Sequence, residues 1–127
     1  MQRVKITGKL PGYNELRKLD RGNPKYANKV LQDYESIVMW QMGRFYKIRT
    51  PCKIHFEWHE LTARRDPDNV DAGGRKIILD ALQKAGKLEN DNWKHVRGGG
   101  WDMVVDRKAK DYYVIVTVFE VDDFEHI

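Results

Sequence analysis

The sequence has little of several features, and each shortage excludes a class of protein. Cys52 is the only cysteine among 127 residues, so the chain forms no internal disulfide and offers no thiolate cluster for zinc. It falls in an apolar strand pattern and is expected to pack in the core. No apolar run approaches the length of about 18 residues that spans a bilayer, and the amino end lacks the apolar segment of a signal peptide. We therefore expect one domain, residues 1–127, in a reducing cytoplasm and without a membrane partner.

The charge balance favours a polyanionic partner. Lys and Arg number 23 against 19 Asp and Glu, which gives a net charge of +4 and a pI near 9.2. Several of the acids are concentrated between Asp66 and Asp91 and in the tail from Asp122 to Glu125. The remaining surface is therefore more positive than the average suggests, as in proteins that bind nucleic acid.

Hydrophobic periodicity predicts an α+β (mixed α/β) fold with a single sheet of about four strands and two helices packed on it. The expected order is β-α-β-α-β-β, with strands at about 4–10, 50–58, 101–106 and 111–121 and helices at about 26–45 and 75–85. Residues 13–25 are polar and basic and are expected to form a loop. The last strand is apolar on both faces, which predicts an interior position in the sheet.

The run Arg64-Arg65-Asp66-Pro67-Asp68-Asn69 follows the predicted strand 50–58 and is the centre of the functional argument. In an extended segment, residues two apart point the same way, so Asp66 and Asp68 are expected to face one spot. Two carboxylates about 4 Å apart repel by about 4 kcal/mol at the effective dielectric of a protein surface. A divalent cation turns that repulsion into attraction, and hard oxygen ligands suit Mg²⁺, Mn²⁺ or Ca²⁺. The alternative interpretation is a simple turn, because Asp, Pro and Asn all favour turns.

Further short motifs accompany this run: Leu10-Pro11-Gly12-Tyr13-Asn14-Glu15, Met39-Trp40-Gln41, Leu79-Asp80-Ala81-Leu82, Lys84-Ala85-Gly86 and Asn90-Asp91. Together they resemble the RusA family of Holliday-junction resolvases, in its phage-type branch. The similarity runs over most of the chain and is densest from Arg64 to Trp93. It implies a single RusA-like nuclease domain that forms a homodimer and uses Mg²⁺, with Mn²⁺ as a substitute. It also implies an endonuclease, typical of prophages, that cleaves branched DNA in recombination and repair.

Carried over by position, the resemblance implies that Asp66, Asp68 and Asp91 hold the metal and that Lys76 assists catalysis. Carboxylate-bound Mg²⁺ supplies a nucleophile near neutral pH and stabilises the leaving oxygen of a phosphodiester, and a nearby Lys adds positive charge in the transition state. The predicted DNA-binding residues are the basic side chains around this site: Arg64, Arg65, Arg75, Lys84, Lys94 and Arg97. The alternative interpretation is that these basic side chains form an ordinary solvated surface.

Two departures from the family pattern keep other functions open. Six residues, Val70 to Arg75, separate Asn69 from Lys76, more than the family pattern has, so Arg75 is an alternative for the basic role. Asn90-Asp91 stands where the family often has two adjacent acids, and Asp71 or Asp102 are candidates for the missing ligand. The alternative function is a non-catalytic DNA-binding protein with a decayed nuclease site. A third is a nuclease of broader range, acting on flaps or RNA.

Overall fold

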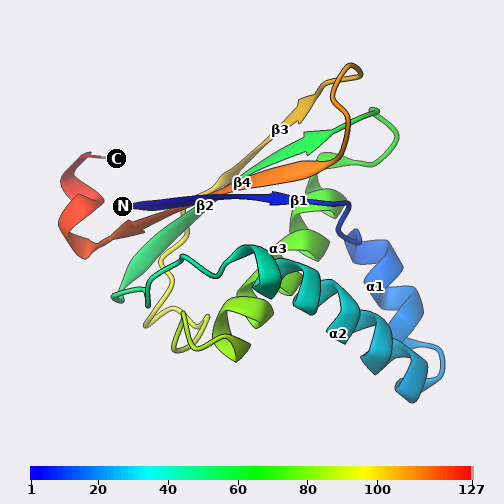
Figure 1. Cartoon of the computed structure of the whole chain (residues 1–127), viewed down its shortest axis with the longest axis horizontal. Coiled ribbons are helices and arrows are strands. Elements are labelled where there is room, and N and C mark those ends of the chain that lie inside the picture. The colour runs from blue at the N-terminus through cyan, green and yellow to red at the C-terminus, as the bar shows by residue number, and fades with distance from the viewer. Residues whose placement is uncertain (127) are drawn as a thin grey trace.

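A computed structural model describes residues 1–126 and confirms the α+β class: one four-stranded sheet carries three helices on one face (Figure 1). The strands are β1 (Gln2–Thr7), β2 (Cys52–Glu60), β3 (Trp101–Val105) and β4 (Tyr113–Glu120). The helices are α1 (Tyr13–Asp20), α2 (Pro24–Gln41) and α3 (Pro67–Lys84), and a 3-10 helix, η1 (Val121–His126), follows β4. Within this part of the chain, none of the helices combines the length and the apolar character that a bilayer crossing requires.

The sheet has the strand order β1-β4-β2-β3, which confirms the predicted interior position of the last strand. β4 pairs antiparallel with β1 and β2, whereas β2 and β3 are parallel. Because β2 and β3 are parallel, their carboxyl ends lie at the same end of the sheet, where Glu60 lies opposite Val105. The loop from β2 to α3 and the loop from β3 to β4 (residues 106–112) therefore leave the sheet side by side, at the upper right of Figure 1. The β3–β4 loop passes the end of β2, because β2 lies between β3 and β4 in the sheet.

The core lies between the sheet and the helices. The side chains of β2 alternate as predicted, and Cys52, Ile54, Phe56 and Trp58 face the helices. They pack with the apolar face of α3: Ile77, Ile78, Ala81 and Leu82. Burial raises the pKa of the Cys52 thiol to about 11, with a smaller contribution from Glu120, which confirms Cys52 as a packing residue.

The loop predicted at residues 13–25 is wrong, because Tyr13–Asp20 forms the helix α1. Leu16 is buried and Leu19 packs on the core, so one side of this polar helix is held by tertiary contact. The Glu15 carboxylate accepts a hydrogen bond of 3.4 Å from the Gly12 amide, as in a capping box. Two apolar residues in one short segment are too few for a helical period to stand out in the sequence.

The extended conformation predicted for this segment is confirmed for Asp66 but is wrong for Asp68, since α3 begins at Pro67 rather than near residue 75. Proline is well suited to the first helical position, where its missing N–H costs nothing. Gly73 and Gly74, which suggested a break, lie inside the helix. A Cβ on Gly73 would overlap the backbone of Pro11, and one on Gly74 would overlap the Trp58 indole. Close packing thus offsets the cost of about 1 kcal/mol for a helical glycine.

Candidate metal and nucleic-acid site

Asp66 and Asp68 lie at the amino end of α3, and both carboxylates are exposed. Asp66 is the N-cap, with φ −67° and ψ 138°, yet its side chain makes no capping hydrogen bond. The backbone N–H of Asn69 donates instead to Asp68 Oδ1, at 3.0 Å. In the described part of the chain the Asp66 carboxylate has no hydrogen-bond or ion-pair partner. The positive end of the helix dipole stabilises both charges, by about 0.3–1 kcal/mol each.

Asn69 fixes this first turn of α3 against the amino end of α1. Its Oδ1 accepts a hydrogen bond of 2.9 Å from the backbone N–H of Asn14. Gly12 lies directly against the Asn69 side chain, in a space that no Cβ would fit. The two acidic residues before Asn69 therefore stand on a helix end whose direction is fixed by a neighbouring element.

Arg65, predicted to contact phosphate, is instead hydrogen-bonded to other groups of the protein. Its Nε and Nη2 donate to the Glu60 carboxylate at 2.8 and 3.0 Å, and its Nη1 donates to the Leu10 carbonyl at 2.7 Å. Only 15% of the Arg65 side chain and 4% of the Glu60 side chain are exposed. This two-pronged ion pair ties the end of β2 to the loop before α1 and holds the start of α3 in place.

Asp71, considered above as an extra metal ligand, is buried and fully engaged. Its Oδ1 accepts a hydrogen bond of 2.9 Å from the Trp58 indole, and its Oδ2 lies 2.7 Å from Arg75 Nη2. The Arg75 guanidinium also lies over the Phe56 ring. Arg75 Nε is buried and has no hydrogen-bond partner. The Trp58–Asp71–Arg75 network therefore holds α3 on the sheet.

Asp91 lies away from the other two predicted ligands. It borders a hollow of about 240 Å³ beside Arg75, together with Ile54, Phe56, Leu79, Val96 and Gly98. Arg75 comes seven residues after Asp68, which is about 10 Å farther along the helix axis. Residues 1–126 contain no group of three or more His, Cys, Asp or Glu side chains placed to hold one ion. The structure places Asp66 and Asp68 in the same first turn of α3, and Asp91 does not join them in a ligand group among the residues that it describes.

The second substitute ligand, Asp102, is on the other side of the sheet. It belongs to β3, and its Oδ2 lies 3.0 Å from Nε2 of His55, a residue of β2 that faces away from the helices. Asp102 therefore belongs to a different surface from the amino end of α3.

The two predicted lysines of α3 have carboxylate neighbours. Lys76 is exposed and pairs with Asp80 at 3.6 Å, one helical turn on. Lys84 Nζ lies 2.7 Å from the buried carboxylate of Glu35 in α2, an ion pair without the alignment of a hydrogen bond. Lys84 therefore links two helices, whereas Lys76 remains open to solvent.

Three more of the basic residues predicted to bind DNA lie outside α3. Arg97 Nε donates to the Trp93 carbonyl at 2.6 Å, and its guanidinium lies over the Trp93 ring. Arg64 and Lys94 are exposed, and neither side chain has a hydrogen bond or ion pair within residues 1–126. Arg64 is thus a free arginine two residues before Asp66.

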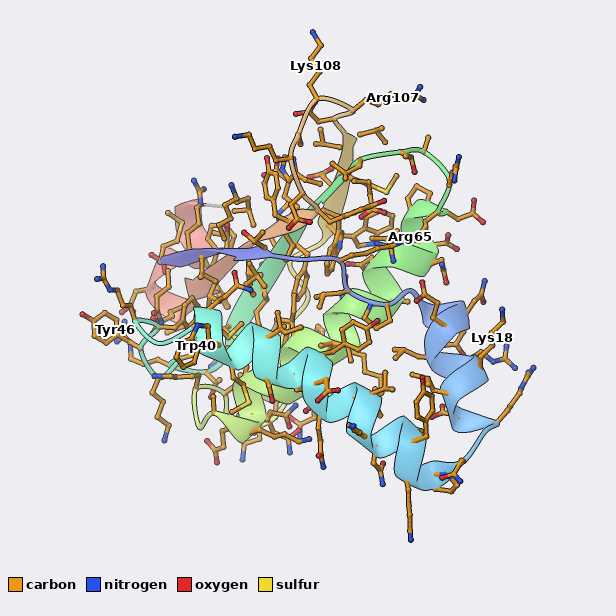
Figure 2. The ribbon with its side chains drawn as sticks, turned by 45° about the vertical axis from the view of Figure 1, so that its right-hand side comes forward. Lys18, Trp40, Tyr46, Arg65, Arg107 and Lys108 are labelled. Atoms are coloured by element: carbon orange, nitrogen blue, oxygen red, sulfur yellow. The ribbon has the colours of Figure 1, made fainter. Side chains whose placement is uncertain are left out.

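A set of basic residues was missed by the sequence argument. Arg107 and Lys108 stand at the tip of the β3–β4 loop, at the top of Figure 2. Arg107 and Arg64 line the same open hollow, of about 540 Å³, with Leu61, Thr62 and Ala63. The signal in the sequence is the run Arg-Lys-Ala-Lys at 107–110, placed between two short strands.

No family model matches this chain, and no curated protein sequence matches it. The resemblance to the RusA family therefore depends on the motifs quoted above. The metal, DNA and dimer assignments stay predictions.

Proposed function

We propose that this protein is a Mg²⁺-dependent, structure-selective endonuclease that acts as a homodimer and cleaves branched DNA such as Holliday junctions. One observation carries the proposal: two exposed carboxylates share the amino end of α3, and that of Asp66 has no partner among the described residues. The exposed, unpaired Arg64 precedes them by two residues. The RusA-like motifs supply the substrate and the reaction.

The donor set suits Mg²⁺. This ion keeps several waters and is commonly held by one or two carboxylates together with substrate phosphate. Asp66 and Asp68 are sufficient for such a site, so the position of Asp91 does not remove the chemistry. A bound Mg²⁺ would supply an activated water and neutralise charge on the phosphate. Arg64 would then hold a neighbouring phosphate through its planar guanidinium.

The surroundings of these residues favour a fixed site. Asp66 follows a strand end held by the Arg65–Glu60 ion pair, and Asp68 precedes the Asn69 contact to α1. Functional groups that rest on rigid elements with locked neighbours lose little entropy when they bind a ligand. The buried charges here serve to position the exposed ones.

A specific observation favours the alternative, a DNA-binding protein without catalysis. Asp91 is separated from Asp66 and Asp68, and the two candidates for the positively charged catalytic residue have carboxylate partners: Arg75 pairs with Asp71, and Lys76 pairs at the surface with Asp80. That protein would bind junctions with a steep salt dependence and release no product.

Cleavage of a labelled four-way junction with and without Mg²⁺ tests the proposal. We expect Asp66→Asn and Asp68→Asn each to lower the cleavage rate roughly a hundredfold or more, since a direct metal ligand should cost at least as much as its supporting partners. Asp33→Asn, an exposed acid of α2, is the matched control and should cut normally. Undiminished cutting by Asp68→Asn would contradict the assignment. Junction binding by the wild type with no product in Mg²⁺ or Mn²⁺ would establish the alternative.

The same assay decides the part played by Asp91. Asp91→Asn should cleave at a rate near that of the wild type if Asp66 and Asp68 hold the ion without it. A loss as large as that of Asp68→Asn would show that Asp91 moves to the metal when DNA binds. Light scattering of the free protein measures whether it is the expected homodimer.

A further inference from the structure

The hollow between the β2–α3 loop and the β3–β4 loop is bordered by two arginines that have no internal partner. We call it the basic hollow, lined by Leu61, Thr62, Ala63, Arg64 and Arg107. It lies at the end of the sheet where the parallel strands β2 and β3 both stop, next to the start of α3. Lys108, beside the hollow, extends from the tip of the same β3–β4 loop, as Figure 2 shows.

The two arginines of the basic hollow and the neighbouring Lys108 differ from most predicted DNA-binding residues in having no partner. The side chains of Arg64, Arg107 and Lys108 are exposed and make no hydrogen bond or ion pair within residues 1–126. Arg65 and Arg75, in contrast, are bound to Glu60 and Asp71. A cation without an internal partner binds an external anion without first giving up a contact.

The acids of the β3–β4 loop are turned toward its own backbone. Asp106 Oδ1 accepts from the Lys108 amide at 2.9 Å, and Asp111 Oδ1 accepts from the Tyr112 amide at 2.7 Å. The Asp106 amide donates to the Glu60 carbonyl at 2.8 Å, so the start of the loop is bonded to the end of β2. The basic side chains therefore project from a fixed turn, and little backbone entropy is lost when they bind.

The position of the hollow matters because it adjoins the two acids. Arg64 and Asp66 are two residues apart, so their Cα atoms are separated by at most about 7 Å. Two arginines on opposite walls suit an anion with repeated phosphates, since each guanidinium grips phosphate as a planar fork. A DNA strand that follows the hollow would present its next phosphates to Asp66 and Asp68.

We propose that the basic hollow binds the phosphate backbone of a duplex arm of the DNA substrate, with Arg64, Arg107 and Lys108 as the contacts. This inference depends on the proposed function for the choice of DNA. Its test uses binding without cleavage, so that its failure and that of the nuclease proposal are separate results.

The experiment is an anisotropy titration of a labelled four-way junction in EDTA, over salt concentrations from about 50 to 200 mM. The variant Arg107→Ala/Lys108→Ala removes two cations of the β3–β4 loop. The control Arg44→Ala/Lys47→Ala removes one exposed Arg and one exposed Lys near Tyr46, far from that loop in Figure 2. Each phosphate contact contributes a slope of about 0.9 in log affinity against log salt, so we expect the slope of the loop variant to be shallower by about 2. Its affinity should fall roughly tenfold or more.

Equal slopes and affinities for the loop variant Arg107→Ala/Lys108→Ala and the control would overturn the inference, as would a wild-type protein that fails to bind the junction. Junction cleavage in Mg²⁺ is scored separately and bears on the nuclease proposal alone. A further variant, Arg107→Glu, should weaken binding more than Arg107→Ala, because it adds repulsion to the loss of a contact. Thermal unfolding of each variant confirms that the fold is intact, as expected for exposed side chains.

Discussion

Replacing Arg65 should destabilise the protein strongly, although the family resemblance assigns this residue to phosphate. In the structure its guanidinium makes two hydrogen bonds to Glu60, at 2.8 and 3.0 Å, and one to the Leu10 carbonyl at 2.7 Å. The variant Arg65→Ala would leave the Glu60 carboxylate buried with its charge uncompensated. Breaking one side of a buried ion pair costs about 3–5 kcal/mol.

That loss is a large part of the total stability of an ordinary domain, about 5–15 kcal/mol. For a chain of this length it corresponds to a fall in Tm of roughly 10–20 °C. Arg64→Ala is the matched control because the neighbouring guanidinium is exposed and unpaired. Its free energy of unfolding should stay within about 0.5 kcal/mol of the wild type.

Urea unfolding followed by fluorescence or circular dichroism measures both variants. The double variant Glu60→Leu/Arg65→Met should regain most of the loss, since replacing a whole buried pair by apolar residues is often neutral. Two results would refute the reasoning: an unchanged Tm for Arg65→Ala, or a double variant no more stable than the single one. If Arg65→Ala instead kept its stability and lost junction binding, Arg65 would be a phosphate contact.

Two further predictions concern packing around the core. Gly74→Ala should cost about 1–3 kcal/mol or more in urea unfolding because the new methyl group meets the Trp58 indole, whereas Gly43→Ala, which meets nothing within 4 Å, should be nearly neutral. At about pH 8, Cys52 should be alkylated at least about a hundredfold more slowly in the native protein than in urea, because its pKa rises from 9.0 to about 11. Its contribution to stability is then complete below pH 9.0 and is lost as the pH rises toward 11; rapid native labelling would contradict this placement of the thiol.

The sheet was predictable from the sequence because its strands carry strong alternating patterns. The buried and half-buried residues of β2 alternate without exception, and β4 is apolar on both faces because β1 and β2 flank it. The helices were harder to predict. The core-facing side of α1 rests on Leu16 and Leu19, and the first half of α3 contains Pro67, Gly73 and Gly74, which suggest a turn when they are read locally. Contacts with Pro11 and Trp58, distant in sequence, decide that half.

The candidate site was predictable only in part for the same reason. Residue type and spacing single out Asp66 and Asp68, and the structure places both exposed at one helix end. The sequence contains no sign that Arg65 pairs with buried Glu60 or that Asp71 accepts a hydrogen bond from buried Trp58. In the sequence, Glu60 and Trp58 look like ordinary strand residues. The place of Asp91 depends on how the segment after α3 returns along the sheet, which local patterns do not specify.

The contrast between Arg64 and Arg65 shows which charges are free to act. The two arginines are adjacent and chemically identical, yet Arg65 is bound to a buried carboxylate and Arg64 opens onto the basic hollow. A buried cation costs several kcal/mol to free from its partner, so it contributes to ligand binding only by holding other groups in place. An exposed and unpaired cation has no such cost, because it binds phosphate without breaking an existing contact. Of the predicted DNA-binding arginines, the structure therefore favours Arg64 over Arg65, with Arg107 across the same hollow as its counterpart.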